Sequence, residues 1–496
     1  MNCQCSDGRG KAVMVLGATS DAGKSVTAVA LCRILSDMGY RVCPFKSQNM
    51  SLNAKVTADG CEISMIQDLQ CRAARTVPTF RVNPILMKPT TDMRSQVIVE
   101  GKVFGVYDVP SYYDDFVPNH GIRILKENLD AIKDDFDFVV MEGAGSPAEI
   151  NIYDVDIANM KAAVAADASC ILVVNLEYGG SFAYVLGTLA LIPEEDRKRI
   201  KAVLYNNVRG STDGVKEGAR MLTEMTGIPS LGVIPHFSAR LPQEDSEFFR
   251  HVDSIGEGRA VIAVIRVPRI SNFTDLDPLY GEDVTVRFVT EPGQLSGCSA
   301  VILPGTKNSI ADMMWLEETG LADSIRSLRG KVPILGICGG YQMMGKKLVD
   351  PDGIEEPGAG SVDGLGLFDS ESYWDTCEKT TVRDEGVFLL TGETVTGYEI
   401  HVGKTRTSEK PMFSVRGQDE GSVREDEMLY GTYLHGVFDK LPFRRHFLSH
   451  IGDDICVSDR DRYSEELEES LDEVARVFRE NIDMDLFRRL FMEGPE

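Results

Sequence analysis

A glycine-flanked cysteine between an apolar run and a helix-like segment is the feature that most constrains the fold. The run Val332-Pro-Ile-Leu-Gly-Ile-Cys-Gly-Gly-Tyr-Gln-Met-Met344 places Cys338 in a G-x-nucleophile-x-G pattern. This pattern predicts a sharp strand-to-helix turn in an α/β fold, because small neighbours tolerate strained backbone. The next backbone N–H and the helix N-terminus would stabilise a thiolate and an oxyanion. We interpret Cys338 as a nucleophile; the alternative is a buried core cysteine.

A cysteine nucleophile needs a base, and two of the seven histidines are candidates. His435 follows an alternating apolar segment in Tyr430-Gly-Thr-Tyr-Leu-His-Gly-Val-Phe438, and His401 ends the strand-like segment Thr396-Gly-Tyr-Glu-Ile-His-Val402. Either could act as the partner in a Cys–His pair, and either could be a structural histidine. We favour His435 over His401.

A second glycine-rich turn lies near the N-terminus, in Gly17-Ala-Thr-Ser-Asp-Ala-Gly-Lys-Ser25. It joins a predicted buried strand (residues 11–17) to a predicted helix (residues 26–38). Such a turn presents backbone N–H groups and a helix dipole to phosphates; Lys24 would neutralise the β/γ-phosphates and Ser25 would ligate Mg²⁺. Five residues rather than the usual four separate Gly17 from Gly23. The pattern predicts nucleotide binding.

Apolar runs separated by helical patterns continue along the N-terminal half, at residues 41–45, 136–141, 170–175, 200–205 and 231–235. This order indicates right-handed βαβ units and a mainly parallel sheet. The polar segment from Gln243 to Arg259 separates it from a second series that begins at residues 260–265. We therefore predict an α/β protein with an N-terminal P-loop-type domain at 1–250, a second α/β domain at 259–445 and a helical C-terminal tail at 446–496. The tail has apolar residues at helical spacing from Leu467 to Ile482, typical of a docked helix.

Polar residues follow several of these predicted strands. Glu142 stands just beyond the apolar strand of Phe138-Val-Val-Met-Glu-Gly-Ala-Gly-Ser146, and Asn206 ends another strand. The carboxyl ends of parallel strands are where such sheets bind ligands, although Glu142 could also be a solvated loop carboxylate. The loop of residues 45–53, which contains Lys46, and the polar stretch 83–97, with Lys88 and Arg94, could offer cations and amides to a phosphate or a polar substrate.

Composition excludes some classes of function. The net charge of −25 disfavours binding to nucleic acid or to anionic membranes. No apolar run is long enough for a membrane span, and the N-terminus lacks the apolar core of a signal peptide. Eleven scattered cysteines, with Cys3-Gln-Cys5 as their closest spacing, indicate free thiols in a reducing cytoplasm.

Residues 259–445, with GICGGYQ around Cys338 and the later YLHG, resemble the class I glutamine amidotransferase domain. The resemblance implies that Cys338 attacks the side-chain amide of L-glutamine, that His435 shuttles the proton, and that ammonia is released. It also implies an oxyanion hole made by the backbone N–H groups of Gly339 and Gly305. Many members have a Glu two residues after the histidine, where this chain has Val437. The third member of the triad is therefore left open; Asp439 is close in sequence, but nothing fixes its geometry.

The long Gly-Lys-Ser loop resembles the dethiobiotin-synthetase branch of P-loop proteins, which activate carboxylates with ATP. The resemblance implies that Glu142 and Ser25 hold Mg²⁺ and that Asn206 reads the adenine. Gly17, Thr19, Gly23, Lys24, Ser25 and Lys46 complete the predicted ATP site.

Nearly the whole chain is similar to the cobyric acid synthase family, the glutamine-dependent amidases of corrinoid biosynthesis. The similarity rests on eight blocks that occur in the family's order: GATSDAGKS, PFKSQNMSLN, NPILMKPTTDMRSQV, MEGAGSPAEIN, LPGTKNSI, GICGGYQMMG, GYEIHVG and GTYLHGVFD. It implies that ATP activates the b, d, e and g carboxylates of adenosylcobyrinic acid a,c-diamide in turn and that ammonia from glutamine displaces phosphate. Two alternatives remain: cobyrinic acid a,c-diamide synthase or another amidoligase, and an ATP-driven regulatory switch with an inactive amidotransferase domain.

Overall fold

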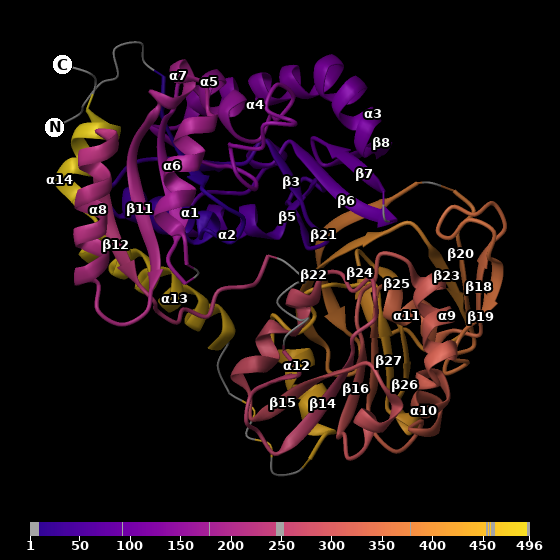
Figure 1. Cartoon of the computed structure of the whole chain (residues 1–496). Helices are drawn as coiled ribbons and strands as arrows, with labels where there is room; N and C mark the ends of the chain where they lie inside the picture. Colours follow the sequence, from indigo (N-terminus) through magenta and orange to yellow (C-terminus); the bar gives the residue numbers. More distant parts are fainter. Residues whose placement is uncertain are drawn as a thin grey trace. The chain divides into compact units, whose positions relative to one another are not determined.

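The protein is described from a computed structural model that covers residues 9–91, 93–177, 179–244, 252–376, 378–452, 455, 457 and 462–493 (Figure 1). Cys3, Cys5 and part of the predicted 243–259 boundary lie outside these residues. The chain forms two compact units, and neither is one continuous stretch of sequence. The first comprises Met1–Met50, Ile63–Leu241 and Leu467–Glu496, and the second comprises Ser51–Glu62 and Pro242–Glu466.

The first unit is built on a six-stranded parallel sheet, as the alternating strand and helix patterns predict. Its strand order is β12-β11-β10-β1-β9-β2, and every neighbouring pair is parallel. The strands are β1 (Lys11–Gly17), β2 (Val42–Phe45), β9 (Phe138–Glu142), β10 (Ser169–Asn175), β11 (Ile200–Val208) and β12 (Ser230–Pro235). Strands β1, β2 and β9 are almost wholly buried, which explains why they read as continuous apolar runs rather than alternating ones.

Helices connect these strands and supply the rest of the core. They are α1 (Lys24–Asp37), α2 (Met65–Ala74), α4 (Ile122–Asp135), α5 (Met160–Ala166), α6 (Ser181–Leu191), α7 (Glu194–Arg197) and α8 (Asp213–Thr226). A smaller sheet of order β3-β6-β7-β8 is formed by β3 (Gln48–Met50), β6 (Ile85–Thr91), β7 (Arg94–Val99) and β8 (Lys102–Asp108), followed by α3 (Val109–Ser111).

The predicted helical tail is confirmed, and its main helix packs in the first unit. Helix α13 (Arg462–Asn481) buries the predicted apolar positions from Leu467 to Phe478, and Arg33 of α1, only 2% exposed, pairs with Glu468 at 2.5 Å. The backbone N–H of Asp483 donates to the carbonyl of Leu231 at 2.8 Å. Figure 1 shows α13 and the short α14 (Met484–Phe487) in yellow among the magenta elements of this unit.

The second unit contains a seven-stranded sheet of order β13-β15-β14-β16-β17-β27-β26. Its five inner strands run parallel: β15 (Val284–Val289), β14 (Ala260–Ile265), β16 (Ala300–Leu303), β17 (Ile334–Ile337) and β27 (Leu429–Thr432). The edge strands β13 (Ser254–Ile255) and β26 (Ser422–Arg424) are antiparallel to their neighbours. The helices are α9 (Ser309–Thr319), α10 (Leu321–Ser327), α11 (Gly339–Met344) and α12 (Leu441–Ser449), with the 3₁₀ helix η4 (Phe273–Gly281).

Two four-stranded sheets complete the second unit. One has the order β19-β18-β20-β23, from β18 (Lys347–Asp350), β19 (Gly360–Asp363), β20 (Ser370–Tyr373) and β23 (Lys404–Thr407). The other has the order β22-β21-β24-β25, from β21 (Thr380–Phe388), β22 (Glu393–His401), β24 (Phe413–Val415) and β25 (Gln418–Glu420). The predicted fold class, an α/β protein with two main domains and a helical C-terminal tail, is confirmed.

Candidate functional site

The turn that carries Cys338 lies between β17 and α11, where the glycine pattern predicts it. Cys338 has φ 51° and ψ −109°, a combination that costs on the order of 1–3 kcal/mol in a non-glycine residue. Its neighbours have no room for a side chain: a Cβ on Gly340 would lie 1.9 Å from the carbonyl oxygen of Leu303, and one on Gly336 would lie 2.6 Å from Met344 Sδ. The surrounding packing therefore holds the strained turn.

The Cys338 side chain is less open than the turn alone predicts, since only 7% of it is exposed. Its Sγ lies 3.7 Å from the carbonyl oxygen of Ile400, at the end of β22. The strand that covers the thiol comes from a segment more than sixty residues away, which a local sequence pattern does not reveal. Because little water screens the thiol, its electrostatic interactions with neighbouring charges are stronger than they would be at the surface.

His435 is the histidine that reaches Cys338. It is 1% exposed, it is hydrogen-bonded to the Cys338 side chain, and its Nδ1 lies 2.7 Å from Oδ2 of Asp275. Burial opposes a charged imidazole, but the charges of Asp275 and Cys338 and the hydrogen bonds to both outweigh it and raise the pKa of His435 to about 10. The neighbouring carboxylate of Asp275 therefore favours the charged form of the imidazole.

Asp275 is the third partner that the sequence left open. Its second oxygen, Oδ1, accepts the backbone N–H of Gly436 at 2.8 Å, so both oxygens of the carboxylate hold the His435 turn. Asp439, the neighbour considered from the sequence, lies 3.8 Å from Lys55 Nζ instead. The available signal was a carboxylate in the connection that follows β14, at the carboxyl end of the parallel sheet.

The two residues predicted to form the oxyanion hole both lie close to the Cys–His pair. A Cβ on Gly305 would lie 3.0 Å from His435 Cε1, so this glycine sits directly against the imidazole. A Cβ on Gly339 would lie 2.5 Å from Thr306 Cγ2, which brings the first turn of α11 against the Gly305–Thr306 turn. The Gly305–Thr306 turn and the first turn of α11 therefore pack against each other beside His435.

His401, the alternative base, makes a different set of contacts. Its Nδ1 lies 2.7 Å from the carbonyl oxygen of Gly403, its Nε2 lies 3.0 Å from Glu399 Oε2, and its ring stacks on Tyr433 with centroids 3.9 Å apart. Both ring nitrogens already face oxygen atoms. These contacts leave His435, and not His401, as the histidine placed between Asp275 and Cys338.

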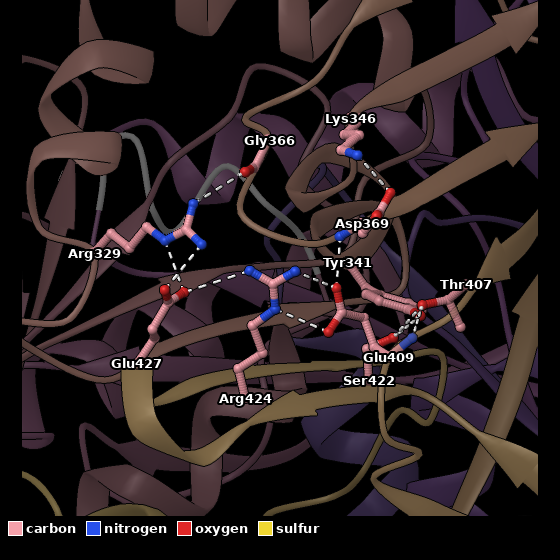
Figure 2. A network of polar contacts seen from close by, with 10 residues as sticks. All are labelled: Arg329, Tyr341, Lys346, Gly366, Asp369, Thr407, Glu409, Ser422, Arg424 and Glu427. Carbon is pink, nitrogen blue, oxygen red and sulfur yellow. Dashed lines mark hydrogen bonds and ion pairs between the residues drawn. The ribbon is translucent and has the colours of Figure 1, made fainter.

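A polar network ties α11, the helix that follows Cys338, to the edge of the sheet (Figure 2). Tyr341 of α11 is hydrogen-bonded through Oη to Ser422 Oγ of β26 at 2.6 Å. Arg424, also on β26, pairs with Glu409 at 2.5 Å and approaches Glu427, which in turn accepts from Arg329 at 2.7 Å. Since β26 pairs with β27, the strand that leads to His435, the network supports both halves of the Cys–His pair.

In the first unit, the predicted phosphate loop runs from the end of β1 into α1. Lys24 begins α1, and its Nζ donates to the carbonyls of Gly145 at 3.0 Å and Thr19 at 3.4 Å. Gly23 has φ 94°, and a Cβ there would lie 2.0 Å from Asn206 Nδ2. Gly17 packs against the lysine, since a Cβ at this position would lie 2.9 Å from Lys24 Nζ. The loop is folded around the Lys24 ammonium at a helix N-terminus, the geometry that binds phosphate.

Glu142, at the end of β9, is the polar centre of this site and is 1% exposed. Its Oε1 accepts Ser25 Oγ at 2.8 Å and lies 2.9 Å from Lys46 Nζ, and its Oε2 accepts Gln70 Nε2 at 2.5 Å. The structure thus brings the predicted residues Ser25, Lys46 and Glu142 together and adds Gln70. Gln70 lies inside α2, and nothing in its local sequence distinguishes it from a surface glutamine.

The pair of Ser25 and Glu142 suits Mg²⁺, which takes few protein oxygens alongside water and phosphate. Among the described residues there is no group of three or more His, Cys, Asp or Glu side chains that could hold a metal alone. Asn206, on β11, donates through Nδ2 to the carbonyl of Ala22 at 3.2 Å, beside the loop rather than remote from it.

Comparisons with known proteins agree with this division of the chain. Residues 13–247 match the family described as the CobQ/CobB/MinD/ParA nucleotide binding domain, and residues 261–443 match the CobB/CobQ-like glutamine amidotransferase domain. A probable cobyric acid synthase from Methanothermobacter thermautotrophicus is 43% identical over 98% of this chain and 99% of its own length. The chain belongs to the cobyric acid synthase family. A cobyric acid synthase from Anoxybacillus flavithermus is 40% identical over 97% of each chain, and one from Clostridium botulinum is 41% identical over 95% of this chain and 98% of its own.

Membership of the cobyric acid synthase family makes the protein an enzyme that joins a nucleotide-binding domain to a glutamine amidotransferase domain. Each of the two sites described above lies within one of the matched ranges. Across the described residues, no helix combines the length and apolar character needed to cross a bilayer.

Proposed function

We propose that this protein converts adenosylcobyrinic acid a,c-diamide to adenosylcobyric acid in the cytoplasm, using ATP and glutamine to amidate the b, d, e and g carboxylates. One observation carries the proposal: a Cys338–His435–Asp275 triad and a phosphate loop whose Ser25 contacts Glu142 occur in a single chain of this family. The seven cysteines in the described part of the chain are free thiols, which suits a reducing compartment.

In the proposed glutaminase half-reaction, the Cys338 thiolate attacks the side-chain carbonyl carbon of glutamine. The oxygen that becomes negative is stabilised by the backbone N–H groups of Gly305 and Gly339. His435 gives its proton to the departing nitrogen, so that NH₃ leaves and a thioester remains on Cys338. His435 then removes a proton from water, which attacks the thioester and releases glutamate. Asp275 holds the imidazole in orientation and stabilises its charged form.

In the proposed synthetase half-reaction, the γ-phosphoryl group of ATP passes to a corrinoid carboxylate, giving an acyl phosphate and ADP. Lys24 and the first-turn N–H groups of α1 bind the phosphates, and Lys46 adds a second cation. Ser25 and Glu142 would hold Mg²⁺, which would neutralise phosphate charge. Ammonia then attacks the acyl carbon, and phosphate leaves. A free carboxylate is a poor electrophile, so activation has to precede the attack.

The test is mass spectrometry of products formed from adenosylcobyrinic acid a,c-diamide, ATP and glutamine. We expect four successive mass losses of about 1 Da each, one for every exchange of OH for NH₂, up to the tetra-amidated product. Amidation of cobyrinic acid itself at the a and c positions would instead assign the a,c-diamide synthase reaction. ATP hydrolysis without any amidation would favour a regulatory ATPase.

Two variants separate the half-reactions. Cys338→Ala should lose amidation with glutamine as the nitrogen source. It should keep amidation with ammonium chloride at alkaline pH. Lys24→Ala should lose ATP-dependent amidation and keep glutamine hydrolysis. Glutamine hydrolysis that survives in Cys338→Ala would refute the nucleophile assignment.

A further inference from the structure

A short segment from the N-terminal part of the chain belongs to the second unit. Ser51–Glu62 follows β3 and precedes α2, both in the first unit, yet it packs with Pro242–Glu466. We call it the excursion. The excursion contains strand β4 (Ala54–Val56). The carbonyl oxygen of Val56 accepts a hydrogen bond from the Arg383 guanidinium at 3.3 Å. Glu62, at the end of the excursion, is 1% exposed and paired with Lys379.

Asn53, in the excursion, caps the helix that carries Asp275. The 3₁₀ helix η4 begins at Phe273, and its own cap residue, Asn272, has φ 50° and makes no side-chain capping bond. The Phe273 N–H donates instead to Asn53 Oδ1 at 3.2 Å. In return, Asn272 Oδ1 accepts the N–H of Ala54 at 3.0 Å. Each asparagine side chain thus accepts the N–H of the residue that follows the other asparagine, and a first-turn donor of η4 is satisfied by a residue 220 positions away.

The position of Asn53 is itself fixed. The side chain is 1% exposed, and its Nδ2 donates to the carbonyl of Glu244 at 3.0 Å. Its backbone N–H donates to Ser51 Oγ at 3.0 Å. A buried amide that uses both its donor and its acceptor has one orientation, so the cap it provides is rigid.

The consequence falls on the triad, because Asp275 lies in the first turn of η4. The Asp275 carboxylate touches His435 Nδ1 at 2.7 Å and Gly436 N at 2.8 Å, and both contacts depend on where that first turn sits. The excursion also reaches the other side of the histidine. Lys55 Nζ lies 4.9 Å from the ring centroid of Tyr398, and that ring stacks on His435 with centroids 5.2 Å apart.

We propose that Asn53 is a positioning residue for glutamine hydrolysis: by capping η4 it holds Asp275 against His435. The inference rests on the triad of the proposed function and assigns to it a residue from the N-terminal part of the chain. Asn53 acts through Asp275 and does not touch the reacting atoms. It should therefore affect the turnover of bound glutamine and not the binding of glutamine.

The experiment measures steady-state glutaminase kinetics of Asn53→Ala in the full-length protein, together with ammonium-dependent amidation. Loss of a side-chain cap misplaces the first turn of η4, so we expect kcat to fall about tenfold. We expect KM for glutamine to stay within about twofold, because the cap lies outside the glutamine site. Ammonium-dependent amidation, which bypasses the triad, should match the wild type.

Two further variants make the result specific. Asn53→Asp keeps an oxygen that accepts the Phe273 N–H but loses the donor to the Glu244 carbonyl, so it should recover part of the lost kcat. Asp59→Asn, at the exposed tip of the excursion, is the matched control and should behave as the wild type in both assays. If Asn53→Ala does not accumulate as folded protein, Asn53→Ser, whose shorter side chain does not span the distance to Phe273, replaces it.

An unchanged kcat in Asn53→Ala would overturn the inference, as would a rise in KM that accounts for the whole loss. Equal losses in the glutamine- and ammonium-dependent reactions would show a general structural defect and would also overturn it. The proposed function fails separately: the wild-type protein would then form no amide even with ammonium, whatever Asn53 does.

Discussion

Replacing Asp275 by asparagine should slow glutamine hydrolysis by two to three orders of magnitude while leaving the fold in place. Asparagine has nearly the same shape, and its oxygen can still accept the N–H of either His435 or Gly436. It cannot carry the negative charge that stabilises the imidazolium. The substitution therefore isolates the electrostatic part of the contact from the packing around it.

The magnitude follows from the His435 pKa of about 10, against an ordinary value of 6.5. That difference corresponds to on the order of 4–5 kcal/mol in favour of the charged imidazole, at about 1.4 kcal/mol per pKa unit. Asp275 and Cys338 share it. If Asp275 supplies about 3–4 kcal/mol of the total, kcat should fall roughly 100- to 1,000-fold, since about 1.4 kcal/mol is tenfold in rate.

The assay is glutamate release from glutamine at pH 7.5, compared between the wild-type protein and Asp275→Asn. Ammonium-dependent amidation by the same preparation reports whether the synthetase half is intact. The matched control is Asp439→Asn, the carboxylate that lies near Lys55 and not against His435; it should retain glutaminase activity within a few-fold. A loss of less than fivefold in Asp275→Asn, or an equal loss in Asp439→Asn, would refute the role given to Asp275.

Three further predictions concern stability. Gly340→Ala should lower the free energy of unfolding by at least about 2–3 kcal/mol, because its Cβ would lie 1.9 Å from the Leu303 carbonyl; urea denaturation measures this, and a wild-type midpoint would contradict it. Burial, with a smaller contribution from a neighbouring charge, raises the pKa of Glu420 to about 8. The folded state therefore keeps this proton to a higher pH than the unfolded chain, whose value is near 4.5, and stability falls as pH rises through that window. Relative to Glu420→Gln, the wild-type protein should lose on the order of 1–4 kcal/mol between pH 5 and pH 9, and parallel stability curves for the two proteins would count against this. Glu468→Ala should cost about 3 kcal/mol by leaving the buried Arg33 guanidinium with a weaker partner; calorimetry would test this, and an unshifted melting temperature would contradict it.

The sequence was informative wherever a local pattern sets a local structure. The glycines around Cys338 and before Lys24 mark turns that only small residues allow, and both turns occur where they are predicted. The buried parallel strands were recognisable because central strands are apolar on both faces. The positions of Glu142 and Asn206 near the phosphate loop followed from the rule that parallel strands end at a common edge.

Contacts between segments that are distant in the sequence could not be predicted from it. Asp275 lies 160 residues before His435. The residues around Asp275 in the sequence do not indicate that a histidine is near. Gln70 contacts Glu142 from the middle of helix α2. The spacing of residues in a helix predicts which side chains share a face, but not which distant residue that face contacts. The two hydrogen bonds by which Asn53 accepts from Phe273 and Asn272 accepts from Ala54 are likewise a property of the folded chain.

The composition of the two units has a consequence for any attempt to divide this protein. The chain passes from one unit to the other after Met50, Glu62, Leu241 and Glu466. A gene cut in the 243–259 linker would give a synthetase fragment without α13, leaving Arg33 without Glu468. It would also give a glutaminase fragment whose Asp275 helix has lost the cap from Asn53. Separate production of the halves should therefore yield two damaged proteins, and an exchange of domains between relatives would have to carry the excursion with one half and the C-terminal helix with the other.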